Sequence, residues 1–151
     1  MKIGEIKYPE SIQSTLIAPC GMNCGLCMGY LRDPGEKNYC PGCRGDVADL
    51  PRSCGGCRIR NCAEISAGGK SFCFECAKFP CTRLRQLDKR YRTKYGMSMI
   101  ENLESIRALG LEAFVRREQD RWKCPECGGV ICVHKLSCIY CDRLRDMTQS
   151  A

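Results

Sequence analysis

Sixteen of the 151 residues are cysteine, and the cysteines are grouped in close sets along the chain. Two thiolates separated by two residues can bind one metal ion from a single tight turn, so this spacing is typical of coordination. The sets are Cys20/Cys24/Cys27, Cys40/Cys43, Cys54/Cys57/Cys62, Cys73/Cys76/Cys81, Cys124/Cys127/Cys132 and Cys138/Cys141. The pattern predicts a metal-binding protein, but it does not indicate what the metal is used for.

The rest of the sequence favours metal ions over disulfides. Residues 1–19 contain no apolar signal region, and no segment is long and apolar enough to cross a membrane. We therefore expect a cytoplasmic protein, in which thiols stay reduced and a high cysteine count indicates metal ligands. The alternative is a secreted protein with eight disulfides, which would require a signal that precedes this numbering.

The net charge depends on the state of the thiols. The formal value of +7 counts every thiol as neutral. A zinc ion with four thiolates carries a charge of about −2, because the ligands lose their protons on binding. Four such sites would use all sixteen cysteines and bring the net charge to about −1. The overall basic charge is therefore a weak indication of nucleic-acid binding.

We expect a small, metal-stapled α+β fold with an irregular cysteine-knuckle core, two to three central helices and a C-terminal zinc-ribbon-like knuckle. The core has too few apolar residues to fold alone, so metal sites, at about 10–16 kcal/mol each, must stabilise it. The expected segments are a lead-in (1–19), a cysteine-rich metal-binding core (20–81), a helical segment (82–122), the knuckle (123–142) and a tail (143–151).

The helical segment carries the clearest local signals. Apolar side chains from Leu84 to Tyr95 recur on one helix face, and Gly96 follows as a stop. Ser98 then begins a capping box for a second helix, which ends at Gly110 before a third helical stretch. The first helix also has a basic face around residues 83–94. This face is either a solvated helix surface or a binding surface for protein or nucleic acid. Its basic residues are Arg83, Arg85, Lys89, Arg90, Arg92 and Lys94.

An internal repetition gives the best metal signal. Cys40-x2-Cys43-x10-Cys54-x2-Cys57 and Cys124-x2-Cys127-x10-Cys138-x2-Cys141 have identical spacing. Two such turns can converge on one ion as a closed site of four thiolates. A glycine follows the first turn of each copy and permits positive φ, so backbone N–H groups can point at the sulfurs. The C-terminal quartet is complete without Cys132 or His134, and His134 is more typical of a surface or supporting residue than of a ligand.

The first half permits more than one grouping. Cys-x2-Cys-x4-Cys occurs at 54/57/62, 73/76/81 and 124/127/132, and on that pattern Cys62 replaces Cys54 beside the 40/43 pair. We expect all eleven cysteines between 20 and 81 to bind metal and assign no individual quartet among them. Zinc is the favoured ion, and an iron–sulfur cluster for electron transfer or redox sensing is the alternative, since four-thiolate sites suit both.

An enzyme is the weakest interpretation, so we expect a non-catalytic interaction module. Hydrolytic zinc sites keep an open position and commonly use histidine, but the chain has one histidine. The triad Cys20/Cys24/Cys27 is the place where an open site would occur. Its spacing matches radical S-adenosylmethionine enzymes, but the chain lacks the length and the alternating strands and helices of those enzymes.

Four cysteine motifs in order resemble a known family. They are Ala18-Pro19-Cys20-Gly21-Met22-Asn23-Cys24-Gly25-Leu26-Cys27, Cys40-Pro-Gly-Cys43-Arg44, Cys57-Arg-Ile-Arg-Asn-Cys62-Ala63 and Phe72-Cys73-Phe-Glu-Cys76-Ala-Lys-Phe79-Pro80-Cys81. Over about residues 16–90 the chain is similar to a family of small cysteine-rich bacterial and archaeal proteins of unknown function. The resemblance implies a soluble, cytosolic, metal-binding protein without an established activity. The helical segment and C-terminal knuckle would extend the common core, and Cys54 is the cysteine the family pattern least requires.

Overall fold

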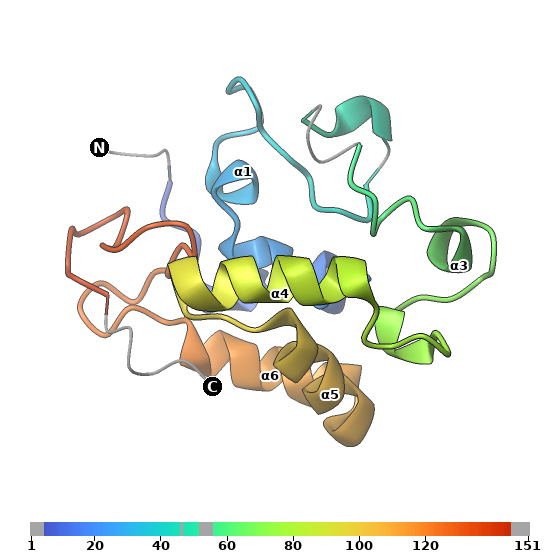
Figure 1. Cartoon of the computed structure of the whole chain (residues 1–151). Coiled ribbons are helices and arrows are strands. Elements are labelled where there is room, and N and C mark those ends of the chain that lie inside the picture. Colours follow the sequence, from blue (N-terminus) through green and yellow to red (C-terminus); the bar gives the residue numbers. More distant parts are fainter. Residues whose placement is uncertain (1–4, 46, 52–55, 146–151) are drawn as a thin grey trace.

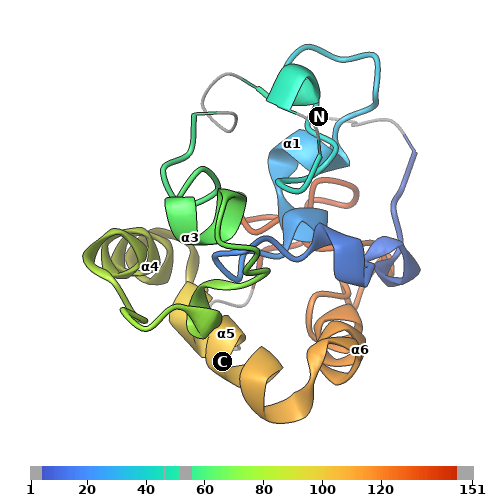
Figure 2. The ribbon, with the colours of Figure 1, turned by 90° about the vertical axis from the view of Figure 1, so that its right-hand side faces the viewer.

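The computed structural model describes residues 5–45, 47–51 and 56–145. Its three longer helices are α4 (Thr82–Tyr95), α5 (Met99–Leu109) and α6 (Leu111–Arg121), and α1 (Met28–Leu31) and α3 (Ala63–Ser66) are single turns. Short 3-10 turns are η1 (Pro9–Ser11), η2 (Ser14–Leu16), η3 (Cys24–Leu26), η4 (Val47–Asp49) and η5 (Cys73–Glu75). Figure 2 shows α4, α5 and α6 arranged around the N-terminal segment.

The corner between α4 and α5 forms as the sequence predicts. Gly96 ends α4 in the left-handed conformation at φ 68°, and Ser98 caps α5 by accepting a hydrogen bond from Glu101 N at 3.1 Å. The buried carboxylate of Asp88 accepts hydrogen bonds from Ser98 Oγ at 2.6 Å and from Ile100 N at 3.0 Å. Side chain and cap together fix the turn between the two helices.

One apolar core connects distant parts of the chain. Ile12 and Ile17 from the first residues, Phe114 from α6, and Val130 and Val133 near the C-terminus are fully buried. Because α6 contacts both η1 and η2, residues 9–16 pack directly against this helix. The described cysteine-rich residues thus share an apolar core with the helices, and metal sites are not the only contacts that hold them.

The α+β class expected from the sequence is not confirmed, because the described ranges contain helices and no extended strand. Three isolated bridges are present, between Ile17 and Asn23, Lys123 and Val130, and Ser137 and Leu144. The last two close the cysteine turns of the C-terminal segment. Each has a single bridge, because the segments that flank the turns leave the hairpin after one pair and pack against the helices.

No helix among the described residues has the length and apolar character needed to span a bilayer.

Candidate metal centre

Four cysteines of the C-terminal segment converge at one point. The sulfur atoms of Cys124, Cys127, Cys138 and Cys141 all lie within 4.8 Å of one another. The Sγ atoms of Cys124 and Cys141 are 3.7 Å apart, and those of Cys127 and Cys138 are also 3.7 Å apart. A tetrahedron with Zn–S bonds of about 2.3 Å has edges of about 3.8 Å, whereas a disulfide bond is about 2.05 Å long. The quartet could therefore hold one metal ion.

Two similar turns present these sulfurs. In the first, Cys124 N donates to Gly129 O at 2.8 Å and Gly128 N donates to Cys124 O at 2.9 Å. In the second, Cys138 N donates to Arg143 O at 2.8 Å and Asp142 N donates to Cys138 O at 2.9 Å. Gly128 and Asp142 take the equivalent left-handed positions, with φ of 79° and 64°. The predicted glycine conformation is confirmed in this copy, with Asp142 adopting the same conformation in the second turn.

Backbone N–H groups point at the sulfurs, as the turn chemistry predicts. Gly129 N lies 3.5 Å from Cys127 Sγ. Burial raises the pKa of the Cys124 thiol, but hydrogen bonds from the backbone of Cys127 and Glu126 outweigh this effect and lower the pKa to about 7. Burial and the neighbouring cysteines raise the pKa of Cys127 in the same turn to about 12. The turn therefore favours the thiolate at Cys124, and a metal ion would have to displace the Cys127 proton, because the thiolate is the form that binds metal.

The quartet is anchored to the rest of the protein on three sides. Ile131 N donates to the carbonyl of Trp122 at the end of α6 at 2.8 Å. Val130 N donates to Lys7 O and Val133 N to Leu26 O, both at 2.9 Å. A metal ion here would therefore join the last segment to α6 and to the N-terminal residues.

A buried acid supports this end of α6. Glu118 is fully buried, and its Oε1 accepts hydrogen bonds from Trp122 Nε1 at 3.2 Å and Asn23 Nδ2 at 3.3 Å. Its Oε2 lies 3.6 Å from Arg121. Burial raises the pKa of Glu118, while Arg121 opposes this shift. The Glu118 network fixes Trp122 next to the first cysteine of the quartet.

The two extra residues of this segment lie outside the quartet. Cys132 is fully buried in the apolar core. His134 Nδ1 accepts from Met28 N at 3.3 Å, and Nε2 lies 2.8 Å from the hydroxyl of Tyr91. Burial, followed by Arg145 and Lys135, lowers the pKa of His134. Both ring nitrogens thus bind protein groups, and a neutral ring with its proton on Nε2 satisfies both contacts.

A second group of cysteines gathers where the N-terminal loops meet. Cys43 N donates to Cys24 Sγ at 3.4 Å. A hydrogen bond with Cys24, together with Arg60 and Arg44, lowers the pKa of Cys43 to about 7 against the opposite effect of burial. Burial also raises the pKa of Cys20, and the nearby thiolates of Cys43, Cys73 and Cys57 raise it further.

Two arginines hold these loops together. Arg44 donates to Ile17 O and to Ser71 O, both at 2.7 Å. Arg60 donates to Cys43 O at 2.7 Å and to Gly45 O at 2.6 Å. Their charges lie beside the cysteines and would offset a thiolate cluster.

The remaining predicted ligands are distributed around these groups. Gly29 lies against both Cys27 and Cys40, since a Cβ added at Gly29 would lie 3.7 Å from Cys27 Sγ and 3.0 Å from Cys40 Cβ. Cys62, Cys73, Cys76 and Cys81 line one small cavity. Cys54 lies outside the described residues. Among the described side chains, the C-terminal quartet is the group whose sulfurs meet the 4.8 Å spacing. Metal binding by the triad Cys20/Cys24/Cys27 stays a prediction.

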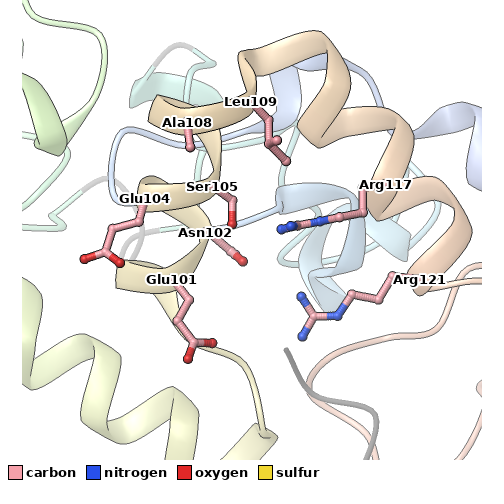
Figure 3. A pocket seen from close by; sticks show the side chains of 8 residues that line it. All are labelled: Glu101, Asn102, Glu104, Ser105, Ala108, Leu109, Arg117 and Arg121. Carbon is pink, nitrogen blue, oxygen red and sulfur yellow. The ribbon is translucent and has the colours of Figure 1, made fainter.

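A groove of about 760 Å³ lies between α5 and α6, and no sequence motif indicated it. Figure 3 shows the guanidinium groups of Arg117 and Arg121 directed from α6 toward α5, which carries Glu101 and Glu104. Opposite charges on the two walls largely offset each other, so the groove is not a strongly charged recognition surface.

No curated protein matches the chain. No solved structure matches it either. Residues 16–86 match the model of a family described as a protein of unknown function, DUF3795, and this match confirms the resemblance seen in the sequence over that part of the chain.

Proposed function

We propose that this protein is a zinc-binding interaction module in which the metal has a structural role. The observation that carries the proposal is the convergence of four sulfurs, with 3.7 Å edges, in the C-terminal quartet. Zinc in a structural site is tetrahedral and prefers four such ligands. A quartet of thiolates leaves no open position for a substrate, which favours a stabilising over a catalytic role.

The cysteines between 20 and 81 belong to the same proposal. Among the described ones, Cys24 and Cys43 are in contact, Cys62, Cys73, Cys76 and Cys81 line one cavity, and Arg44 and Arg60 donate hydrogen bonds around the Cys43 turn. Thiolates brought together in this way repel one another unless a cation lies between them. We therefore assign these cysteines to metal binding as well.

The surface offered to a partner is the basic face of α4. All six of its basic side chains are exposed, and Arg92 pairs with Asp88 at 2.6 Å. Tyr91 and Tyr95 contact the His134 ring edge-on, with centroids 5.6 Å and 5.0 Å away, so the two rings are not free to stack on bases. The face therefore offers charge alone, which suits phosphate or carboxylate groups on a protein or nucleic acid.

A metal analysis tests the main proposal. We expect protein purified without oxygen to be colourless and to contain zinc. Cys138→Ser should lose one zinc equivalent, whereas Cys132→Ala, which changes a buried cysteine outside the quartet, should keep its full zinc content. Unchanged zinc in Cys138→Ser would refute the C-terminal site.

A salt-dependent filter-binding assay tests the nucleic-acid branch of the partner proposal. Contacts to phosphates weaken linearly with log salt. Reversal of charge at Arg85, Lys89 and Arg90 should abolish such binding if α4 carries it. If the protein binds no nucleic acid at low salt, the nucleic-acid branch is refuted and an acidic protein remains as the partner class.

An iron–sulfur protein is the second candidate, and one observation favours it. Cys24 and Cys43 are in contact, and the charges of Arg44 and Arg60 act on Cys43. Cysteine thiolates with charged groups around them are also the ligands of iron–sulfur clusters. Visible absorbance and iron in the anaerobic protein would support this candidate, and colourless protein with stoichiometric zinc would exclude it.

A further inference from the structure

We propose that Cys62, Cys73, Cys76 and Cys81 form a separate metal site that binds one thiophilic divalent ion. This assignment deepens the proposed function, which leaves the grouping of the N-terminal cysteines open, and it rests on that function only for the choice of zinc as the ion. It does not depend on the C-terminal quartet.

The four cysteines share a single enclosed space. They line a cavity of about 40 Å³, together with apolar side chains that include Ile59, Phe79 and Leu84. One water molecule needs about 10–15 Å³ on this kind of measure, so the cavity suits one ion better than a cluster of iron and sulfide atoms. Figure 1 places the elements that carry these cysteines, α3, η5 and the start of α4, next to one another.

The turn at Cys73 and Cys76 repeats the geometry of the C-terminal quartet. Cys76 N donates to Cys73 O at 3.1 Å, which closes η5. Lys78 N then lies 3.4 Å from Cys76 Sγ. In the quartet the equivalent donor is Gly129, which also follows the second cysteine of its turn by two residues and lies 3.5 Å from Cys127 Sγ. The same N–H contact with sulfur occurs in both places.

Cys81 takes its position from α4. It is the N-cap residue of this 14-residue helix, and Arg85 N donates to its carbonyl at 2.9 Å. The start of the helix therefore places Cys81 at the cavity.

The charges around the cavity suit four thiolates bound to one divalent ion. Four thiolates around one divalent ion would carry a charge of about −2, and the exposed Arg58 and Arg83 lie at the cavity to offset it.

The cavity must contract when an ion binds. Among the described residues, the 4.8 Å spacing is met by the C-terminal quartet alone, so the four sulfurs here are spread more widely. Binding would draw the Cys62 and Cys81 sulfurs toward the η5 turn and release the thiol protons. Metal binding and local ordering are commonly coupled in this way.

The test is the zinc content of the full-length protein. Cys76→Ser and Cys81→Ser should each lose one zinc equivalent relative to wild type, and Cys76→Ser combined with Cys138→Ser should lose two. Cys132→Ala, a buried cysteine outside both sites, is the matched control and should lose none. Full zinc content in both Cys76→Ser and Cys81→Ser would overturn the assignment. Loss of zinc in Cys76→Ser but not in Cys138→Ser would instead refute the C-terminal site and leave this one standing.

A second measurement does not depend on the folding of a variant. Wild-type protein is alkylated with and without a zinc chelator, and the modified cysteines are identified by mass spectrometry. We expect Cys62, Cys73, Cys76 and Cys81 to be protected together, to become reactive together after chelation, and to be protected again when zinc is restored. Independent reactivity of the four, unaffected by zinc, would contradict a shared ion.

Discussion

The single tryptophan reports directly on the C-terminal quartet. Trp122 is 3 % exposed, ends α6 and lies two residues before Cys124. We expect Cys138→Ser, which removes one ligand, to release residues 123–145 from the body and expose the Trp122 ring to water.

The magnitudes explain why one ligand should have this effect. Burial of Trp122, Val130 and Val133 contributes about 10 kcal/mol in total, whereas ordering roughly twenty residues costs at least about 20 kcal/mol. The backbone hydrogen bonds of the segment add only about 1 kcal/mol each. A structural zinc site supplies about 10–16 kcal/mol, which is enough to make the folded segment stable.

The assay is tryptophan fluorescence at equal protein concentration in zinc buffer. Wild type should emit at short wavelength, and Cys138→Ser should emit at longer wavelength with greater quenching by iodide. Removal of zinc by a chelator should shift the emission of wild type to the longer wavelength of Cys138→Ser. Restoring one zinc equivalent at this site should return the emission to the shorter wavelength. Cys76→Ser is the contrast, because its site lies near the opposite end of α4 and Trp122 should stay buried. Short-wavelength emission from metal-free wild type, with metal loss verified by analysis, would refute this reasoning.

Three further substitutions test the fold around the sites, each by denaturant unfolding with zinc in excess. Asp88→Ala should lower the free energy of unfolding by about 3 kcal/mol, because the buried carboxylate caps α5 and accepts a hydrogen bond from Ser98. Burial opposes ionisation of Asp88, but these hydrogen bonds lower its pKa. The loss of stability should therefore persist at neutral pH and shrink only as the pH falls below about 4. A difference unchanged in acid would contradict this role. His134→Gln should lower the free energy of unfolding by about 1–2 kcal/mol near pH 7.5. Because the pKa of His134 is lowered in the folded protein, the unfolded state binds the proton first as the pH falls, so wild type loses stability and its advantage over the variant should narrow below about pH 6.5. A stability difference that does not change with pH would contradict a neutral ring. Gly21→Ala should lower the free energy of unfolding by about 2–4 kcal/mol, because at φ 90° the added Cβ would lie 2.7 Å from a backbone carbonyl oxygen of α5. The control Gly69→Ala also has a positive φ, 71°, but its Cβ would meet open space, so it should lower the free energy of unfolding by about 1 kcal/mol. Equal losses of stability in the two variants would show that the close approach does not matter.

The C-terminal quartet could be predicted from the sequence because its information is local. Two Cys-x2-Cys turns need only a spacing and a left-handed residue after each, and Gly128 supplies one of these. The α4–α5 corner could be predicted for the same reason, since Gly96 and Ser98 act on their own neighbours. Both features depend on contacts within a few residues of chain.

The grouping of the N-terminal cysteines could not be predicted, because spacing alone permits several combinations. What distinguishes them is packing across the chain: Arg60 fixes the Cys43 turn, and Cys73 N donates to Pro19 O at 2.9 Å. Cys132 matched a repeated spacing but lies in the core, because Val133 N binds Leu26 O more than one hundred residues earlier. The α+β class failed similarly, since the cysteine turns form single bridges and not ladders.

The position of α4 between the two sulfur groups gives the metal sites a common consequence. Its first end begins at Cys81 in the small cavity, and near its last end Tyr91 bonds His134 of the C-terminal segment. Figure 1 shows the helix extending between these two regions. A 14-residue helix is about 21 Å long. Contacts at both ends of α4 therefore hold its exposed basic face in a fixed position. If both proposed sites hold ions, loss of either ion would free one end of α4 and reduce the order of its basic face. We therefore expect partner binding through this face to depend on metal, without any metal contact to the partner.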